Sequence, residues 1–317
     1  MTNYLVTGGA GFIGSHIATR LVEMGGTVRV LDNLCAGFRH NLEHVEHHIE
    51  FIEGDVADEA VVDKAMRGIE IVFHQAALAS VPMSLNNPLA THRACVTGTV
   101  TVLNAAVKAG VRRLLYAASS SAYGDRPYSA KRESDLPQVL SPYAAAKLAG
   151  EFYLEAFYRS FGLETVGLRY FNVFGPRQDP NSPYSAVIPL FVTRLLSGQR
   201  PVVYGDGGQS RDFTFVENVV EGNILASQAS NVAGRIFNMA DGRQTTLLQL
   251  LHILGELLEV DIEPDFQPAR VGDVRESLAD ISLARHFLAY EPKTNLEEGL
   301  RRTIDYYKSS AKASLAM

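Results

Sequence analysis

Short apolar runs alternate with longer segments of helical period along the first 175 residues. The runs rich in Val, Ile, Leu and Phe that we predict as strands are 3–7, 27–31, 49–53, 70–74, 112–117 and 164–170. The segments that we predict as helices are 12–25, 58–67, 89–109 and 143–161. The strand runs are nearly continuous rather than alternating, as expected when helices cover both faces of a sheet. This pattern predicts an α/β fold with a doubly wound parallel sheet.

The pattern changes after about residue 175, where prolines and the run Gly205-Asp206-Gly207-Gly208 separate shorter elements. Helices are predicted there at 186–197, 216–229, 246–258 and 295–308. The apolar run 236–239 is predicted as one more strand of the main sheet. We therefore expect a first domain over 1–175, which also includes about 213–240, and a smaller C-terminal lobe over 176–317 that interleaves with it.

Composition restricts the class of partner. The 317 residues carry a formal charge of −6, with basic and acidic residues interspersed, so no stripe predicts nucleic-acid or membrane binding. A strand follows the N-terminus almost at once, which differs from a secretory signal. Cys35 and Cys95 have neither disulfide nor metal spacing, and no Cys or carboxylate set completes the cluster of His40, His44, His47 and His48. We expect a cytoplasmic protein without a metal.

A glycine-rich turn follows the first predicted strand. Gly8, Gly11 and Gly14 have the spacing G-x-x-G-x-x-G, and they directly precede an amphipathic helix. Such glycines let backbone N–H groups approach a dinucleotide diphosphate, as in a Rossmann sheet. Asp32 ends the second predicted strand, and a carboxylate there favours NAD over NADP, although Arg39 lies nearby. Asp55 follows the third strand, where it could meet the adenine amine or cap the next helix.

Tyr143 and Lys147 lie four residues apart at the start of a predicted helix. Side chains with this spacing project from one face, one turn apart. The Lys147 ammonium would stabilise a phenolate and so lower the pKa of Tyr143 toward neutrality. The pair could then remove a proton from a substrate hydroxyl.

These motifs occur in an order that resembles a known family. The Gly8–Gly14 turn, Asp55-Val56, Ser119–Gly124 and Tyr143-x-x-x-Lys147 are similar to the extended short-chain dehydrogenases/reductases, and more narrowly to the nucleotide-sugar 4-epimerases. The resemblance covers nearly the whole chain. Further matching segments are Arg169–Pro176, Arg211–Phe213 and Arg270–Arg275.

The resemblance implies a mechanism for Ser119, Tyr143 and Lys147. Tyr143 would take the sugar O4 proton while hydride passes from C4 to NAD⁺, Lys147 would hold the phenolate, and Ser119 would orient O4. A transient 4-keto sugar would then turn over and regain hydride on its other face, so that NAD is recycled. The implied cofactor-binding residues are Gly8, Gly11, Phe12, Ile13, Gly14, Asp32, Asn33, Asp55, Val56, Ala76, Tyr143 and Lys147.

The resemblance also places a UDP-sugar in the C-terminal lobe. Arg211 and Arg270 would bind the diphosphate, because forked guanidinium donors match phosphate oxygens. Related dehydratases and decarboxylases carry acidic residues where this chain has Ser120 and Ser121, which favours epimerisation. Ser277 stands at a gate beside the sugar C2 substituent, where a small residue admits an N-acetyl group. The implied substrate-binding residues are Ser80, Ser121, Tyr143, Asn172, Arg211, Arg270, Asp273 and Ser277.

The sequence therefore predicts an NAD-dependent UDP-sugar 4-epimerase for UDP-GlcNAc/UDP-GalNAc, with UDP-Glc/UDP-Gal as a second pair. The alternatives are an epimerase of another nucleotide sugar, such as UDP-glucuronate, and a non-catalytic NAD-binding regulator. One departure from the family is Cys95, which replaces an Asn that supports contacts near the catalytic Tyr. The family also implies a homodimer through helices near 89–109 and 143–161.

Overall fold

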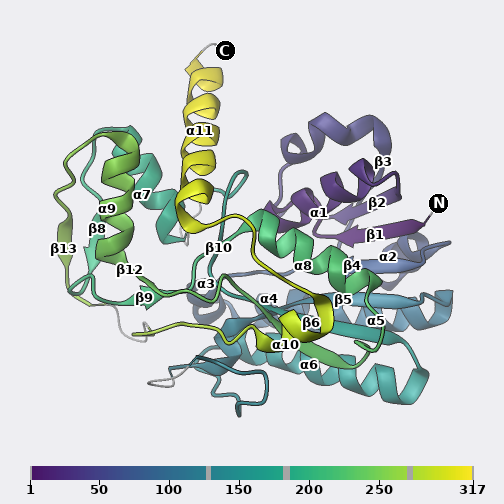
Figure 1. Cartoon of the computed structure of the whole chain (residues 1–317). Coiled ribbons are helices and arrows are strands. Elements are labelled where there is room, and N and C mark those ends of the chain that lie inside the picture. The colour runs from purple at the N-terminus through teal and green to yellow at the C-terminus, as the bar shows by residue number, and fades with distance from the viewer. Residues whose placement is uncertain (1, 126–129, 181–185, 270–273, 316–317) are drawn as a thin grey trace.

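The computed structural model describes residues 2–125, 130–180, 186–269 and 274–315. A seven-stranded sheet with the order β11-β6-β5-β4-β1-β2-β3 forms its centre, and every neighbouring pair is parallel (Figure 1). The strands are β1 (Asn3–Thr7), β2 (Thr27–Asp32), β3 (Ile49–Glu53), β4 (Ile71–His74), β5 (Arg113–Ser119), β6 (Glu164–Tyr170) and β11 (Arg235–Met239). The predicted parallel α/β sheet is confirmed, and the apolar run at 236–239 is its edge strand.

Helices cover both faces of this sheet, as the continuous apolar strands require. The first face packs on α1 (Phe12–Glu23) and α8 (Val216–Gln228). The second face packs on α2 (Glu59–Met66), α5 (Gly98–Ala109) and α6 (Pro142–Phe161). The active-site candidates on α6 and the glycine turn before α1 therefore approach the sheet from opposite faces.

The predicted helix over 89–109 is present as one continuous helical run from Pro88 to Ala109, and a π-helical turn that was not predicted lies in its middle. Its residues belong to α4 (Pro88–His92), the π-helical turn η2 (Arg93–Thr97) and α5. A π turn inserts one extra residue into a helix and frequently lies at a functional site. Cys95 is buried in this turn, and its carbonyl oxygen accepts a 2.6 Å hydrogen bond from the Thr99 hydroxyl. The short helix α3 (Val81–Asn86) precedes α4.

The other elements lie mostly after residue 170, and several gather beside the sheet rather than on it (Figure 1). The helices are η1 (Arg39–His48), η3 (Ser120–Tyr123), α7 (Val187–Leu196), α9 (Leu247–Leu258), α10 (Ser282–Leu288) and α11 (Leu296–Leu315). The short strands form three pairs: β7 (Val173–Phe174) with β10 (Thr214–Phe215), β9 (Ser210–Arg211) with β12 (Thr245–Thr246), and β8 (Val202–Tyr204) with β13 (Asp265–Gln267). The division into two lobes near residue 175 stays a prediction.

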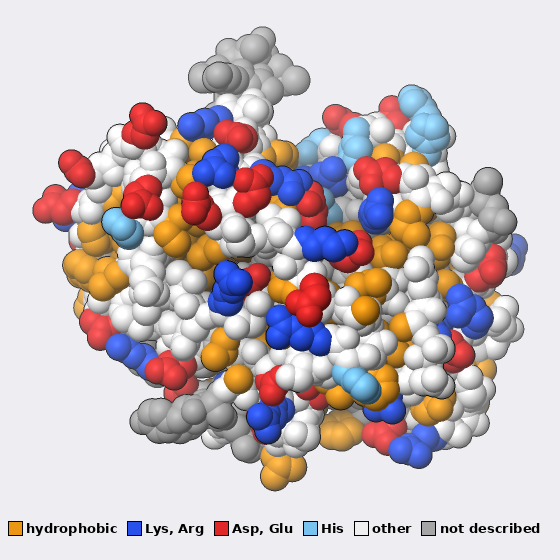
Figure 2. Space-filling model, viewed as in Figure 1, with side chains coloured by type: hydrophobic (Ala, Val, Ile, Leu, Met, Phe, Trp, Pro, Cys, Tyr) orange, Lys and Arg blue, Asp and Glu red, His pale blue; other side chains and the backbone are white. Residues whose placement is uncertain are grey.

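The visible surface carries both signs of charge. Lys and Arg side chains are interspersed with Asp and Glu over the face in Figure 2, without a large patch of one sign. Within the described residues, no helix is both long enough and apolar enough to cross a membrane. In the same part of the chain, no three His, Cys, Asp or Glu side chains form a group that could hold a metal ion.

A buried ion pair joins α6 to β6. The Arg169 guanidinium donates to the two Glu151 carboxylate oxygens at 2.8 and 2.6 Å, and both side chains are only 6% exposed. Arg169 also stacks over the Tyr123 ring at 4.6 Å. Because Glu151 lies one turn after Lys147, this bidentate pair fixes the position of α6, which carries Tyr143 and Lys147, against the sheet.

Glu151→Ala should destabilise the fold by about 3–5 kcal/mol, because it leaves the Arg169 guanidinium buried without its counter-ion. Urea unfolding would measure this loss. Glu155→Ala is the matched control, because Glu155 pairs with Arg159 on the same helix at 2.9 Å with side chains 52% and 72% exposed. That exposed pair should contribute at most about 1 kcal/mol. Equal losses in the two variants would contradict a structural role for the buried pair.

Candidate active site

One large cavity, of about 1050 Å³, opens at the carboxyl ends of the sheet strands. It includes the crevice between β1 and β4, where the strand order reverses and where ligands of such sheets bind. Arg270 and Asp273 lie outside the described residues. Every other predicted site residue lines this cavity: Gly8, Gly11, Phe12, Ile13, Gly14, Asp32, Asn33, Asp55, Val56, Ala76, Ser80, Ser119, Ser121, Tyr143, Lys147, Asn172, Arg211 and Ser277.

The glycine turn fits a dinucleotide because backbone segments approach one another closely there. Gly8 has a φ of +68°, and a Cβ at this position would lie 2.6 Å from the Ala76 amide nitrogen. A Cβ on Gly14 would collide with the Gly8 carbonyl oxygen. Gly11 is the N-cap of α1, and neither a side-chain cap nor an acidic residue occupies the first turn of this helix. The first-turn N–H groups of α1 are thus suited to a diphosphate.

Asp32 ends β2 at the rim of the turn. Its Oδ2 accepts from the Ala10 N–H at 2.9 Å and its Oδ1 accepts from the Leu34 N–H at 2.8 Å. Burial raises the pKa of this carboxyl from its ordinary value, and the backbone hydrogen bonds oppose that rise. Arg39 is directed away, because it pairs with Glu53 at 2.9 Å and covers the Phe51 ring.

Asp55 does not cap the next helix, so that alternative is wrong. The N-cap of α2 is Asp58, whose carboxylate accepts from the Ala60 and Val61 amides. Asp55 instead accepts from the Ala57 N–H at 2.8 Å and lies 3.3 Å from the Arg93 guanidinium. Its carboxylate remains on the cavity wall, where the adenine contact stays a prediction.

The start of α6 positions the Tyr–Lys pair. Ser141 caps the helix by accepting from the Ala144 N–H at 3.1 Å, and Pro142 occupies the first turn. Tyr143 and Lys147 then both reach the cavity from this helix. The Lys147 ammonium donates to the Ala117 carbonyl oxygen at 2.8 Å and lies 4.9 Å from the Tyr116 ring centre.

The expected effect of Lys147 on Tyr143 is not found in this structure. Burial raises the pKa of Tyr143 well above its ordinary value, the nearby Cys95 raises it further, and a hydrogen bond with Ser119 lowers it. Burial also lowers the pKa of Lys147. The ammonium faces a backbone carbonyl rather than the phenol, so desolvation dominates both groups.

Ser119 and Ser121 form a hydroxyl chain at the end of β5. The Ser119 Oγ accepts from the Ser121 N–H at 3.2 Å and from the Ser121 Oγ at 2.8 Å. These two donors occupy both lone pairs of the Ser119 hydroxyl, whose own proton is therefore directed outward as a donor. Positions 119–121 carry only hydroxyl side chains, so this segment contributes no carboxylic acid to the site.

The side of the cavity that carries Arg211 and Ser277 is formed by a wall that Asp212 holds together. Its carboxylate accepts from the backbone N–H groups of Asp241, Gly242 and Ala279 at 3.0, 3.1 and 3.2 Å. The Ser277 N–H donates to the Ser210 carbonyl oxygen at 3.2 Å, so the segment with the predicted gate packs against the strand that carries Arg211. Burial raises the pKa of Asp212 to about 7.

Gln75 and Lys131 are two of the polar cavity residues that sequence reasoning did not select. Gln75 directly follows β4, so the same rule that selected Asp32 and Asp55 at strand ends could have found it. Lys131 is only 3% exposed and lines the cavity, and no motif marks it. Two backbone hydrogen bonds hold Lys131 beside the wall that contains Ser277. The Lys131 N–H donates to the Leu278 carbonyl oxygen at 2.8 Å, and the Lys131 carbonyl oxygen accepts from the Asp280 N–H at 2.9 Å.

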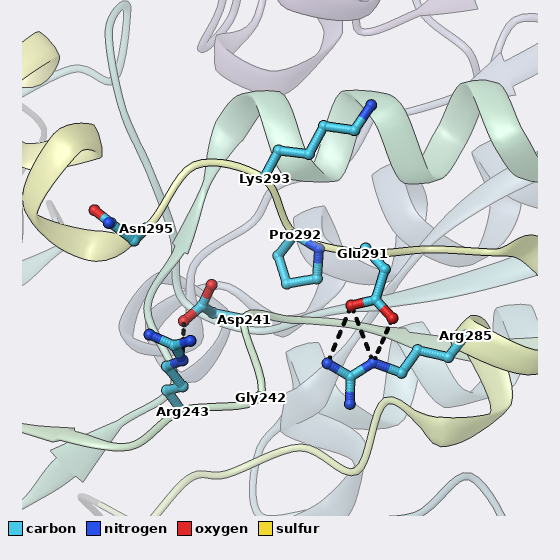
Figure 3. A pocket seen from close by; sticks show the side chains of 8 residues that line it. All are labelled: Asp241, Gly242, Arg243, Arg285, Glu291, Pro292, Lys293 and Asn295. Atoms are coloured by element: carbon cyan, nitrogen blue, oxygen red, sulfur yellow. Dashed lines mark hydrogen bonds and ion pairs between the residues drawn. The ribbon is translucent and has the colours of Figure 1, made fainter.

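A second cavity, of about 320 Å³, lies behind this wall and contains none of the predicted site residues (Figure 3). Four of its charged side chains are paired with one another, Arg285 with Glu291 at 3.1 Å and Arg243 with Asp241 at 3.9 Å, and Lys293 pairs with Glu221 outside the cavity at 3.5 Å. Asp241 and Gly242 connect it to Asp212 through the backbone. The large cavity is therefore the candidate active site.

Comparison with known proteins gives concordant matches. Residues 4–240 match the model of the NAD dependent epimerase/dehydratase family. The UDP-glucose 4-epimerase of Mycolicibacterium smegmatis is 34% identical, covering 97% of this chain and 99% of that protein. The UDP-glucose 4-epimerase of Thermotoga maritima, solved with UDP-glucose, is 39% identical with a TM-score of 0.93 over 98% of this chain and all of that one.

A third relative acts on a different sugar. The UDP-N-acetylglucosamine 4-epimerase of Methanobrevibacter ruminantium, solved with UDP-N-acetylmuramic acid, is 40% identical. The two structures superpose with a TM-score of 0.94, covering 98% of this chain and 99% of that one. Similar folds in this group thus accommodate different sugars.

Asp32→Asn should reduce the preference for NAD over NADP, because the variant loses the negative charge that repels a 2′-phosphate. Calorimetric titration with each dinucleotide should show the ratio of the two dissociation constants falling about tenfold, a change of about 1.4 kcal/mol. Asp55→Asn is the control and should leave this ratio unchanged. An unchanged ratio in Asp32→Asn would remove Asp32 from cofactor discrimination.

Proposed function

The chain belongs to the NAD-dependent epimerase/dehydratase family, and we propose that it inverts C4 of a UDP-linked sugar through a transient 4-keto sugar. The observation that carries this proposal is the convergence of Ser119, Tyr143 and Lys147 in one cavity with the glycine turn. A non-catalytic regulator would not need this trio.

The proposed reaction assigns one task to each side chain. Bound NAD supplies a reversible hydride acceptor. Tyr143 removes the O4 proton and later returns it, and Lys147 holds the phenolate from one helical turn away. The one outward-directed proton of Ser119 is directed to Tyr143 in this structure and would turn to the reacting O4 of a bound sugar, since both acceptor positions of the Ser119 Oγ are filled by Ser121. Elimination or decarboxylation would require an acid that Ser120 and Ser121 do not provide.

Burial of Tyr143 has a consequence for this step. Because the pKa of Tyr143 is raised, its phenolate is disfavoured until a positive charge or a hydrogen bond compensates for the lost solvation. In this structure Ser119 supplies such a hydrogen bond. The Lys147 ammonium is held by the Ala117 carbonyl oxygen, so in the proposed reaction it would have to turn toward the phenol before its charge could stabilise the phenolate.

We propose UDP-GlcNAc and UDP-GalNAc as the preferred pair, with UDP-Glc and UDP-Gal as a second pair. The small Ser277 on the cavity wall and the M. ruminantium relative support the N-acetylated sugar, and the T. maritima relative supports the second pair. UDP-glucuronate is the alternative substrate that the assay below includes.

We also propose a homodimer through the regions 89–109 and 143–161. Apolar side chains project from α4 and α6 into solvent, with Leu89, Phe152 and Phe161 81%, 62% and 60% exposed. Large apolar residues grouped on two adjacent helices support an interface between two copies.

Tyr143→Phe should slow epimerisation by about 10²–10⁴-fold, because it removes the acid–base group but keeps the ring. Proton NMR would follow UDP-GlcNAc, UDP-Glc and UDP-glucuronate in separate samples with NAD present. Tyr153→Phe on the same helix lies outside the cavity and should retain wild-type rates. Near-full turnover by Tyr143→Phe would refute the mechanism, and turnover of UDP-glucuronate alone would reassign the substrate.

Ser277→Tyr tests the gate. A bulky ring on this wall should reduce kcat/KM for UDP-GlcNAc at least about tenfold relative to that for UDP-Glc, a difference of about 1.4 kcal/mol. The same NMR assay would give both values, and Ser277→Ala should leave their ratio near that of the wild type. Parallel losses for both sugars in Ser277→Tyr would show that this position does not discriminate at C2.

A further inference from the structure

Gln75 carries a buried amide nitrogen whose partner the protein does not supply. Its Nε2 atom has no hydrogen-bond partner among the described residues, although the atom is inaccessible to solvent. Buried side-chain donors are nearly always hydrogen-bonded, so an exception at a ligand cavity indicates a partner that belongs to the ligand. Gln75 lines the 1050 Å³ cavity.

A chain of hydrogen bonds fixes which end of this amide is unpaired. The Asn223 Nδ2 donates to the Val219 carbonyl oxygen at 2.8 Å and to the Tyr170 Oη at 2.9 Å. The one proton of the Tyr170 hydroxyl has two acceptors within reach, the Gln75 Oε1 at 3.1 Å and the Asn223 Oδ1 at 3.2 Å. The Gln75 Oε1 thus faces a possible donor, and the Nε2 is the end of the amide that has no partner. Asn223 lies on α8 and Tyr170 ends β6, so the chain runs from the helix across the sheet.

The position of Gln75 indicates what this donor meets. Its backbone N–H donates to the Thr7 carbonyl oxygen at 3.0 Å, directly before the Gly8 turn. The next residue, Ala76, is the one whose amide nitrogen would lie 2.6 Å from a Cβ on Gly8. Gln75 therefore occupies the crevice between β1 and β4 that is suited to the dinucleotide.

We propose that the Gln75 Nε2 donates a hydrogen bond to an oxygen of bound NAD, and that Tyr170 and Asn223 are positioning residues for this donor. The inference rests on the proposed function only through the cofactor, and it holds for any sugar. This hydrogen bond would hold NAD through residues supported by α8, on the face of the sheet opposite to α6, which carries Tyr143 and Lys147. The acceptor class is an oxygen of the diphosphate, a ribose or the nicotinamide carboxamide.

The test is calorimetric binding of NAD to nucleotide-stripped full-length protein, without any sugar. Gln75→Leu should weaken NAD binding about tenfold, which corresponds to about 1.4 kcal/mol. Gln75→Glu keeps an acceptor for Tyr170 but places negative charge on the cavity side, so it should weaken binding at least as much. Gln209→Leu is the control, because Gln209 is a buried glutamine outside the cavity, and it should bind NAD like the wild type.

ADP-ribose serves as the second ligand and identifies the acceptor. A loss for NAD but not for ADP-ribose assigns the oxygen to the nicotinamide carboxamide, and equal losses assign it to the diphosphate or a ribose. Gln75→Glu with wild-type affinity would overturn the proposal, because it would mean that the cavity-facing atom is an acceptor. Gln75→Leu with affinity within twofold of the wild type would overturn it as well.

The outcomes separate this inference from the proposed function. If Gln75→Leu weakens NAD binding and no UDP-sugar is epimerised, the Gln75 contact stands and the epimerase proposal fails. If the wild type itself binds no NAD, both fail. The melting temperature of each variant, measured without ligand, shows whether a loss of NAD affinity comes from unfolding. Tyr170→Phe should reduce the affinity for NAD less than Gln75→Leu does, because it removes only a residue that positions the donor.

Discussion

The parallel pairing of every strand in the central sheet is the constraint on which the rest of the molecule depends. Parallel strands bring all their carboxyl ends to one edge, and the reversal of strand order at β1 leaves a crevice there. Gly8, Gln75 and Ser119 follow or end three different strands and still line one cavity. The site is assembled by sheet geometry from residues that are far apart in the sequence.

Burial governs the chemistry of this site more than the pairing of charges does. Desolvation is the largest cause of the raised pKa of Tyr143 and of the lowered pKa of Lys147. Each shift favours the neutral form, so this arrangement of the two side chains resists forming the phenolate and the ammonium together. The proposed proton transfer would therefore rely on donors that are already oriented, such as Ser119 with both acceptor positions filled by Ser121.

Sequence predicted the features that local patterns determine. Buried parallel strands are continuous apolar runs, so the sheet could be predicted, and predicted site residues such as Gly14 and Asp32 lie on the large cavity. The π turn within 89–109 was missed because it inserts a residue without changing the helical composition. Lys147 is directed toward the Ala117 carbonyl, and Lys131 lies at the cavity wall through backbone hydrogen bonds with residues 278 and 280. Both positions depend on packing between distant segments, which no local pattern in the sequence determines.

The wall that carries Ser277 shows why the family is easier to predict than the sugar. Asp212 accepts with both carboxylate oxygens from three backbone N–H groups, so Asn at this position would direct its amide nitrogen at another donor. The carboxylate thereby sets the backbone path near Ser277, because Ala279 is one of its donors. In the proposed gate, the room beside the sugar would depend on this backbone path as well as on the side chain at 277. A substrate preference set in this way is harder to predict than the family, because hydrogen bonds between distant segments determine the path.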